Sequence, residues 1–317
     1  MKILVIRFSA IGDILLTFPI VESLVHKYPS AEIHFLTKPS NKPVLELLSS
    51  KLQPRFLQES LVQTAKQLRG ERYDLVIDLH NNLRSFLLQL LMTKWSWKRF
   101  RKLNFQKWLY TALKWNTLPK VHVVDRYAQA ASVKPTAVSL AVSNSMVVES
   151  LPLHYVAWVL GAKFSTKQYP LSKLIETIEC LDIPIVLLGG EKEISMASSL
   201  QAHFPSLISF VGKTSLSEAA LVLSKAKVVV TNDTGLMHLA AFYAKPMVCI
   251  WGNTVPAFGM YPYQSAPVFD AQVSDLSCRP CSKIGHNTCP KGHFECMLKH
   301  DSSPLAAQIT ALFFQEN

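Results

Sequence analysis

The chain has 317 residues, of which 49% are hydrophobic and 17% charged. This composition is typical of a folded globular enzyme and excludes a disordered chain, and the length favours two domains. The net charge of +11 indicates an anionic partner, which leaves nucleic acid, an anionic membrane surface and a phosphorylated substrate as candidate classes.

We expect the N-terminal stretch to form a buried strand and not a signal peptide. Arg7 and Asp13 interrupt the first apolar run within the length that the core of a signal peptide needs. No uncharged window reaches 18 apolar residues, which is the minimum for a membrane-spanning helix. We therefore expect a cytoplasmic protein.

Short apolar runs alternate with amphipathic stretches in the first half of the chain. Strands are predicted at residues 2–8, 32–37 and 73–80. Helices are predicted at residues 13–26, 44–48, 61–68, 83–93 and 123–131. This alternation favours βαβ units and a parallel sheet, and hence the α/β class.

The second half repeats this alternation, with longer runs of Val, Ile and Leu that suit strands buried on both faces. Strands are predicted at residues 155–161, 184–190, 207–211, 227–232 and 247–251. Helices are predicted at residues 172–180, 193–204, 217–225 and 236–243, where apolar residues have helical spacing.

Residues 132–153 show no period and contain Pro135 and Pro152, so we expect the linker there. The chain then divides into two Rossmann-like domains that face each other across a cleft. The first covers residues 1–150 and the second residues 151–317, with a cysteine-rich loop at 278–296 and a final helix. Ligands are expected at the carboxyl ends of the strands.

The stretch VVVTNDTGLMHLAAFYAKP, residues 228–246, carries the strongest signal for a ligand site. A buried strand leads into Asn232, Asp233, Thr234 and Gly235, and a helix follows. The free N–H groups and the positive end of that helix are suited to a pyrophosphate. The alternative is a well-capped helix with a partly buried His238.

Asp13, in the stretch SAIGD, lies where the first strand gives way to a helix. A carboxylate at this edge can accept a proton from a hydroxyl nucleophile, or it can simply cap the helix. Lys167 is the candidate for a phosphate contact in the second half. The chain has no G-x-G-x-x-G after a strand, no P-loop and no D-x-D pair, which disfavours dinucleotide redox chemistry, P-loop hydrolysis and a metal held by paired carboxylates.

The stretches RFSAIGDILLTFP (7–19) and NDTGLMHLAA (232–241) resemble the ADP-heptose:lipopolysaccharide heptosyltransferase family, glycosyltransferase family 9. The resemblance extends from Met1 to about residue 300. It implies the GT-B architecture and transfer of heptose from ADP-L-glycero-D-manno-heptose, with inversion, onto the Kdo or heptose of a lipid A-core acceptor. It implies neither a cofactor nor a catalytic metal.

The resemblance also assigns roles to particular residues. Asp13 matches the catalytic base, and Gly12 and Arg84 match positions that meet the acceptor. The positions that match the donor site are Lys167, Glu193, Asp233, Thr234, Gly235, Leu236 and His238. Glu193 is similar to the acid that holds the adenosine ribose, although Glu191 lies only two residues away.

The segment KWSWKRFRKLNFQKW, residues 94–108, is rich in Lys, Arg and aromatic residues. Three interpretations stay open: a nucleic-acid contact, a contact with the lipid-linked acceptor or the inner face of the inner membrane, and a solvated basic face anchored by Trp. With the family resemblance we expect no nucleic-acid partner.

Four cysteines, Cys278, Cys281, Cys289 and Cys296, lie within residues 278–296 in the spacing C-x2-C-x7-C-x6-C. This pattern leaves open a structural zinc site, with His286 and His293 as further ligands, or a loop of reduced thiols. Cys180 and Cys249 lie in apolar segments and are predicted to be core residues.

Two other functions compete with heptose transfer. One is a GT-B enzyme that uses another nucleotide sugar, such as an epimerase or another core glycosyltransferase. The other is a basic nucleic-acid-binding protein with a zinc-stabilised tail, which would bind DNA or RNA with a strong salt dependence. The βαβ alternation and the two strand-end motifs favour the transferase.

Overall fold

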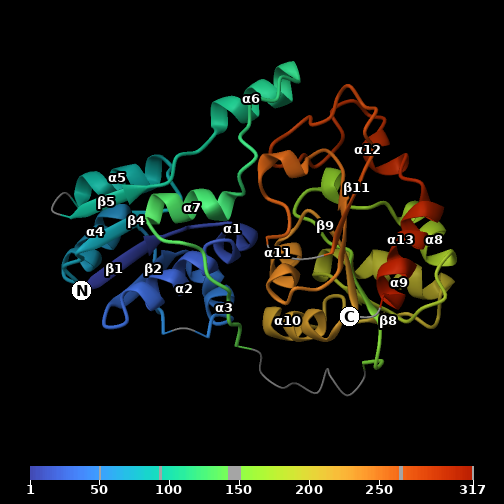
Figure 1. Ribbon diagram of the computed structural model, residues 1–317, viewed down its shortest axis with the longest axis horizontal. Coiled ribbons are helices and arrows are strands. Elements are labelled where there is room, and N and C mark those ends of the chain that lie inside the picture. The colour runs from blue at the N-terminus through green and yellow to red at the C-terminus, as the bar shows by residue number, and fades with distance from the viewer. Residues whose placement is uncertain (50, 93–94, 142–150, 264–266, 316–317) are drawn as a thin grey trace. The chain divides into compact units, whose positions relative to one another are not determined.

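The computed structural model describes residues 1–49, 51–92, 95–141, 151–263 and 267–315, which form two compact units (Figure 1). The first unit consists of residues 1–103 and 121–141. The second consists of residues 104–120 and the described part of residues 142–317. The segment 104–120 is thus flanked in sequence by the first unit but packs with the second. Much of the predicted linker, residues 142–150, lies outside the described residues.

The first unit is built on a five-stranded parallel sheet in the order β3-β2-β1-β4-β5. Its strands are β1 (Lys2–Ile6), β2 (Glu32–Thr37), β3 (Gln53–Phe56), β4 (Leu75–Asp78) and β5 (Ser96–Arg99). Residues Ile3 to Ile6 of β1 are fully buried. The central strand therefore needs apolar side chains on both faces, and its sequence ILVI supplies them.

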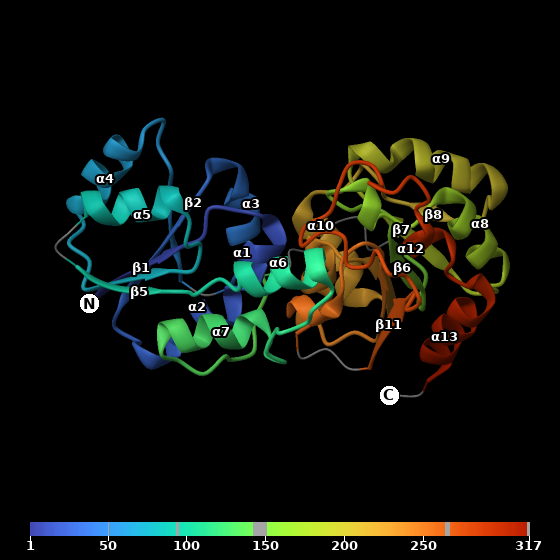
Figure 2. The same ribbon diagram turned by 90° about the horizontal axis from the view of Figure 1, so that it is seen from above.

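Helices cover both faces of this sheet. They are α1 (Ile11–Leu15), α2 (Phe18–Lys27), α3 (Lys42–Leu45), α4 (Leu61–Arg69), α5 (Leu83–Leu91) and α7 (Val123–Ala131), with the 3-10 turn η1 (Pro39–Asn41) before α3. Figure 2 shows α4 and α5 on one side of the sheet and α2 and α7 on the other. The predicted helix 13–26 is in fact two helices, α1 and α2, with the break at Thr17. Pro19 explains the break, because proline has no N–H for a continuing helix.

The second unit contains a six-stranded parallel sheet in the order β11-β10-β9-β6-β7-β8. Its strands are β6 (Val156–Val159), β7 (Ile185–Leu188), β8 (Ile208–Ser209), β9 (Val228–Asn232), β10 (Met247–Trp251) and β11 (Val268–Gln272). The four inner strands are fully or almost fully buried, as their unbroken apolar sequences require.

Helices also cover both faces of the second sheet. They are α8 (Leu171–Glu179), α9 (Ile194–His203), α10 (Leu216–Lys225), α11 (Gly235–Phe242) and α13 (Ser302–Phe314), with shorter turns η3 (Ser165–Lys167), η4 (Glu191–Glu193), η5 (Pro256–Phe258) and α12 (Glu295–Leu298). Helices α8, α9 and α13 share one apolar core with the sheet, while α10 and α11 pack together on the other face (Figure 1). Helix α6 (Asn104–Leu113) also belongs to this unit.

The elements absent from the sequence prediction are the edge strands β3, β5 and β11 and the helix α6. The sequences of β3 and β5 are QPRF and SWKR, which lack a buried apolar run because one side of an edge strand faces solvent. Pro54 is tolerated in β3 because an edge strand has a free N–H side. In the described residues, no helix is long and apolar enough to cross a membrane.

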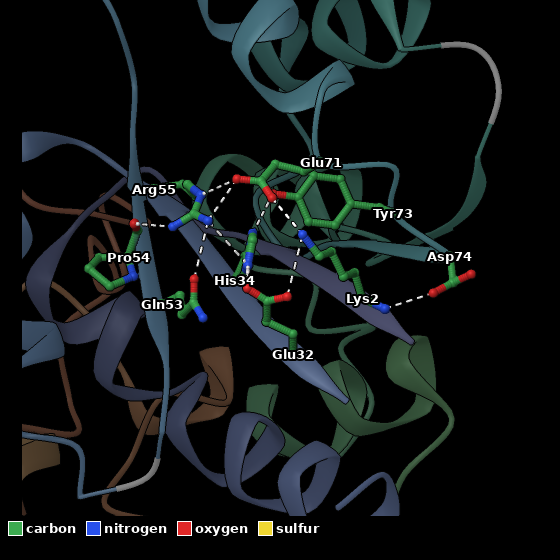
Figure 3. A network of polar contacts seen from close by, with 9 residues as sticks. All are labelled: Lys2, Glu32, His34, Gln53, Pro54, Arg55, Glu71, Tyr73 and Asp74. Atoms are coloured by element: carbon green, nitrogen blue, oxygen red, sulfur yellow. Dashed lines mark hydrogen bonds and ion pairs between the residues drawn. The ribbon is translucent and has the colours of Figure 1, made fainter. Parts of the chain in front are cut away.

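A polar network joins the strands of the first sheet at their amino ends, opposite the edge where ligands are expected (Figure 3). Its members are Lys2, Glu32, His34, Gln53, Pro54, Arg55, Glu71, Tyr73 and Asp74. The Glu71 carboxylate lies 2.8 Å from Lys2 Nζ and 2.7 Å from Arg55 Nη2. The fully buried His34 ring contacts the Tyr73 hydroxyl at 2.7 Å. These contacts tie β1, β2 and β3 to the segment that precedes β4.

The hydrogen bond from Lys2 is the main cause that lowers the pKa of Glu71 to about 2. Because an unfolded glutamate titrates near 4.5, the ionised group stabilises the folded state above that pH. This contribution is lost as the pH falls from about 4.5 towards 2.

We therefore expect Glu71→Gln to lower the free energy of unfolding by about 1 kcal/mol at pH 7, since it removes the charge that Lys2 and Arg55 face. The difference from the wild type should shrink below pH 4.5 and vanish near pH 2. Denaturant titrations at several pH values measure it, with Glu59→Gln on the exposed surface as the control. A difference that stays constant down to pH 2 would contradict this assignment.

Candidate active site

Each sheet has one switch point, which is a pair of neighbouring strands after which the chain turns toward opposite edges of the sheet. In the first sheet this switch point lies between β1 and β4, and in the second between β6 and β9. Loops diverge there at the carboxyl ends of the strands and leave room for a ligand.

Asp13 lies in the first turn of α1, directly after the loop that leaves β1. Its Oδ2 accepts a hydrogen bond from the backbone N–H of Ala10 at 3.1 Å, and its Oδ1 lies 2.6 Å from Arg7 Nη2. About a quarter of the side chain stays exposed. The carboxylate therefore caps the helix and is also open to a reacting group. Gly12 precedes it in the same turn and is half-buried.

Arg7 is buried and fixes Asp13 in place, and the sequence analysis gave it no role. Its guanidinium donates to the carbonyl oxygens of Ser9 and Leu79, at 3.1 and 2.5 Å, in addition to the ion pair with Asp13. Positive charge beside a carboxylate favours the ionised form, which is the form that accepts a proton. In the sequence, the sign of this role is that a charged residue comes directly after a buried strand.

Asp78, at the end of β4, organises the other side of this edge. Its fully buried carboxylate accepts hydrogen bonds from the N–H groups of His80 and Asn81 and from the Ser85 hydroxyl, and lies 3.2 Å from Arg99 Nε. These contacts fix the turn between β4 and α5.

His80 belongs to the same edge and was also absent from the sequence analysis. Burial, together with the charges of Arg7 and Lys102, lowers its pKa to about 3, so the ring is neutral at physiological pH. Its ring packs on Phe8 with the centroids 4.8 Å apart. Arg84 is exposed in the first turn of α5 and acts electrostatically on His80. The structure thus gathers Arg7, Asp13, His80 and Arg84 around one edge.

In the second unit, Lys167 and Asp233 form an ion pair. They lie in the loops that follow β6 and β9, the two strands of the switch point. Lys167 Nζ lies 2.6 Å from Asp233 Oδ2, and both side chains are largely buried. The hydroxyl of Thr254, from the loop after β10, donates to the same oxygen at 2.7 Å. A lysine held in this way can present its remaining N–H groups to an anion.

The interpretation of residues 232–234 as helix caps is wrong. The Asn232 amide accepts from the Tyr169 N–H and donates to the carbonyls of Val159 and Leu160, so it joins β9 to β6. Asp233 is engaged by Lys167, and the N-cap residue Thr234 makes no side-chain cap hydrogen bond. Thr234, Gly235 and Leu236 are half-buried, and His238 is buried one turn into α11.

Glu193 and Glu191 have different environments. Glu193 is buried, and its carboxylate accepts from the Gly190 N–H at 2.9 Å and from Gln168 Nε2 at 3.3 Å, whereas Glu191 is exposed. A Cβ at Gly161 would lie 2.9 Å from the Glu193 carboxylate, so the close approach requires glycine. Glu193 thus lies where β6 and β7 end.

Asn253 is a further residue that the sequence analysis missed. It follows β10, is almost fully buried, and neither oxygen nor nitrogen of its amide has a hydrogen-bond partner in the described part of the chain. It lies next to Thr254, which contacts Asp233. No motif marks it, since a single Asn after a strand is common in turns.

The cysteine-rich loop does not form the metal site that its spacing left open. Within the described residues, which include the whole loop, no three His, Cys, Asp or Glu side chains are arranged to hold a metal ion. Burial raises the pKa of Cys296 to about 12, so this thiol is protonated. Arg279 secures the loop by donating to the carbonyls of Gly252 and Thr254. Cys249 is a core residue as predicted, but Cys180 is exposed.

Asp78→Asn is expected to lower the free energy of unfolding by about 2 kcal/mol, because an amide nitrogen would then face Arg99 and the Ser85 hydroxyl. The N–H groups of His80 and Asn81 would keep an acceptor. Chemical denaturation measures the loss, and the exposed Asp182→Asn serves as the control. An unchanged midpoint would show that Asp78 does not hold this turn.

A family model described as "Glycosyltransferase family 9 (heptosyltransferase)" matches residues 61–291. The lipooligosaccharide heptosyltransferase 2 of Haemophilus influenzae is 25% identical over 297 residues, which cover 81% of this chain and 85% of that protein.

Solved structures share the fold. The ADP-heptose lps heptosyltransferase II of E. coli is 21% identical and covers 99% of both chains with a TM-score of 0.75. E. coli heptosyltransferase WaaC with ADP-2-deoxy-2-fluoro heptose is 18% identical, covers 98% of this chain and 99% of that chain, and gives a TM-score of 0.61. The prediction of a GT-B fold built from Rossmann-like parallel sheets is confirmed.

Proposed function

This chain belongs to glycosyltransferase family 9, the heptosyltransferase family, and on that premise we propose that it transfers heptose from ADP-heptose to the inner core of a lipopolysaccharide precursor. The chain is a glycosyltransferase. The names of its relatives support the acceptor class, and the ADP-heptose analogue bound to a protein of the same fold supports the donor. The acceptor is then a lipid A-core molecule at the cytoplasmic face of the inner membrane.

The observation that carries this proposal is the position of Asp13 and of the Lys167–Asp233 pair, each at the switch point of its own sheet. We assign the acceptor to the first unit, with contacts at Gly12 and Arg84. We assign the donor to the second unit, with contacts at the residues Lys167, Glu193, Asp233, Thr234, Gly235, Leu236 and His238.

In the proposed reaction, Asp13 accepts the proton of the acceptor hydroxyl while that oxygen attacks the anomeric carbon of the heptose. The bond to ADP breaks on the opposite side, which inverts the configuration. Negative charge then builds on the diphosphate. Lys167 and the positive end of α11 would stabilise that charge, so the step needs no metal. Asp233 would orient Lys167, and Glu193 would bind the adenosine ribose.

Asp13→Asn is expected to lower the rate of heptose transfer by roughly 10²-fold or more, because it removes the base. The amide oxygen can still accept from the Ala10 N–H, so the helix should keep its cap. ADP release from ADP-heptose with a Kdo-lipid A acceptor measures the rate. Equal turnover in variant and wild type would make Asp13 a cap only, and no turnover in either would reject this donor and acceptor.

Lys167→Ala is expected to weaken ADP binding roughly 10–100-fold, since a charge-assisted contact to the diphosphate is lost. Calorimetric titration with ADP measures the affinity, and Lys163→Ala, an exposed lysine of the same loop, is the matched control. Unchanged affinity in Lys167→Ala would remove Lys167 from the donor site. A wild-type preference for UDP over ADP would favour the alternative nucleotide-sugar enzyme.

A further inference from the structure

The cysteine-rich loop has no role in the proposed reaction, but its Arg279 is bonded to the segment that follows β10. The guanidinium Nε donates to the carbonyl oxygen of Gly252 at 2.6 Å, and Nη2 donates to that of Thr254 at 3.0 Å. Nη1 donates to the carbonyl oxygen of Val273 at 2.9 Å, and Nη2 donates also to Gln272 Oε1 at 3.0 Å. One side chain thus fixes residues 252–254 against the end of β11.

Residues 252–254 lie next to the ion pair that we assign to the donor. The Thr254 hydroxyl donates to Asp233 Oδ2 at 2.7 Å, and Lys167 Nζ lies 2.6 Å from the same oxygen. Because a hydrogen bond is directional, the place of this hydroxyl depends on the place of its backbone, which Arg279 holds. Two hydrogen bonds therefore connect Arg279 to the carboxylate that pairs with Lys167.

The cysteine-rich loop holds the Lys167 side of the pair as well. Thr166, which precedes Lys167 in η3, is 2% exposed. Its N–H and its hydroxyl donate to the carbonyl oxygen of His286 at 3.2 and 2.9 Å, and the His286 N–H donates to the Thr166 hydroxyl at 2.8 Å. The Asn253 N–H donates to the Thr166 carbonyl at 3.4 Å. The loops that carry Lys167 and Asp233 are thus both fixed by one segment, residues 279–286.

The contacts of Arg279 require a guanidinium group. Its planar fork offers five N–H groups that point in different directions, whereas lysine offers three from a single nitrogen, which cannot reach all four oxygens that Arg279 binds. Elsewhere in this part of the chain lysine supplies the positive charge, since residues 127–317 contain twelve lysines and one arginine. Lys114 Nζ donates to the carbonyls of Cys278 and Pro280, at 3.0 and 2.8 Å, and so fixes the backbone on both sides of Arg279.

We propose that Arg279 is a positioning residue for the diphosphate of the donor. It holds the Thr254 hydroxyl against Asp233, and Asp233 in turn keeps the Lys167 ammonium group beyond the carboxyl end of β6. The hydrogen bond from Thr254 also offsets part of the negative charge of Asp233, which leaves more of the positive charge of Lys167 for a phosphate oxygen. Arg279 acts through these groups and does not itself contact the donor. The inference rests on the proposed function, because it takes the Lys167–Asp233 pair as the place where the diphosphate binds.

Calorimetric titration with ADP tests the proposal. We expect Arg279→Lys and Arg279→Ala each to weaken ADP binding roughly tenfold, although the first keeps the positive charge. Adenosine, which lacks the phosphates, should bind these variants and the wild type equally. Lys291→Ala, which removes an exposed lysine of the same loop, should bind ADP like the wild type. Arg279→Lys tests the proposal even if Arg279→Ala does not fold.

A double-mutant cycle shows whether Arg279 acts through Thr254. Thr254→Val removes the hydroxyl at nearly unchanged volume and should weaken ADP binding by a similar factor. In the Thr254→Val background, Arg279→Lys should cause little further loss, because the group that it positions is already absent. In the transfer reaction, the KM for ADP-heptose should rise roughly tenfold in Arg279→Lys while the KM for the acceptor stays unchanged.

Three results would overturn the proposal. Wild-type ADP affinity in Arg279→Lys, together with a lower melting temperature, would make Arg279 a structural residue only. An equal loss of affinity for adenosine and for ADP would indicate a general disturbance of the second unit. Fully additive losses in the double-mutant cycle would show that Arg279 does not act through Thr254.

The same measurements separate this inference from the proposed function. ADP binding and heptose transfer by the wild type, with unchanged ADP affinity in Arg279→Lys, would reject the positioning role alone. A wild type that binds neither ADP nor ADP-heptose would reject the proposed function and this inference with it. A loss of ADP affinity in Arg279→Lys, without heptose transfer by the wild type, would reject the transfer reaction and leave the positioning role standing.

Discussion

Parallel strands end at the same edge of a sheet, and the chain can leave that edge in two directions only where the strand order reverses. In this protein the reversal occurs once in each sheet, between β1 and β4 and between β6 and β9. The loops that carry Asp13, Lys167 and Asp233 start from three of these strands, β1, β6 and β9. The chemistry that we propose therefore depends first on the register and order of strands whose own side chains are almost entirely buried apolar groups.

Buried polar side chains at the strand ends hold these loops in place. Asp78 accepts hydrogen bonds from the N–H groups of the turn that follows it. Asn232 joins β9 to the end of β6, and Arg7 joins the loop after β1 to the end of β4. Such groups are costly to bury unless they are paired, and each of the three is paired several times. They fix the backbone at these strand ends, while the side chains of Asp13 and Lys167 stay partly exposed.

The amino edge of the first sheet and the stretch of chain after β4 differ in charge. At the amino edge, Lys2 and Arg55 are balanced by Glu32 and Glu71, and the network joins strands to each other. Beyond β4 the chain carries no acid until Asp125, and of the basic residues in this stretch Arg99 pairs with Asp78 at the end of β4.

The sequence by itself determined the α/β class, every buried strand, and the two stretches at residues 7–19 and 232–241, because apolar runs and strand-end motifs are local signals. It missed the edge strands β3, β5 and β11, whose one exposed side removes that signal. Only the tertiary structure decided the pairs Arg7 with Leu79 and Lys167 with Asp233, whose members lie 72 and 66 positions apart. It also distinguished Glu193 from Glu191 through a close approach to Gly161. Contacts of this kind depend on which strands become neighbours, and that order is fixed by packing over the whole sheet rather than by any short stretch of residues.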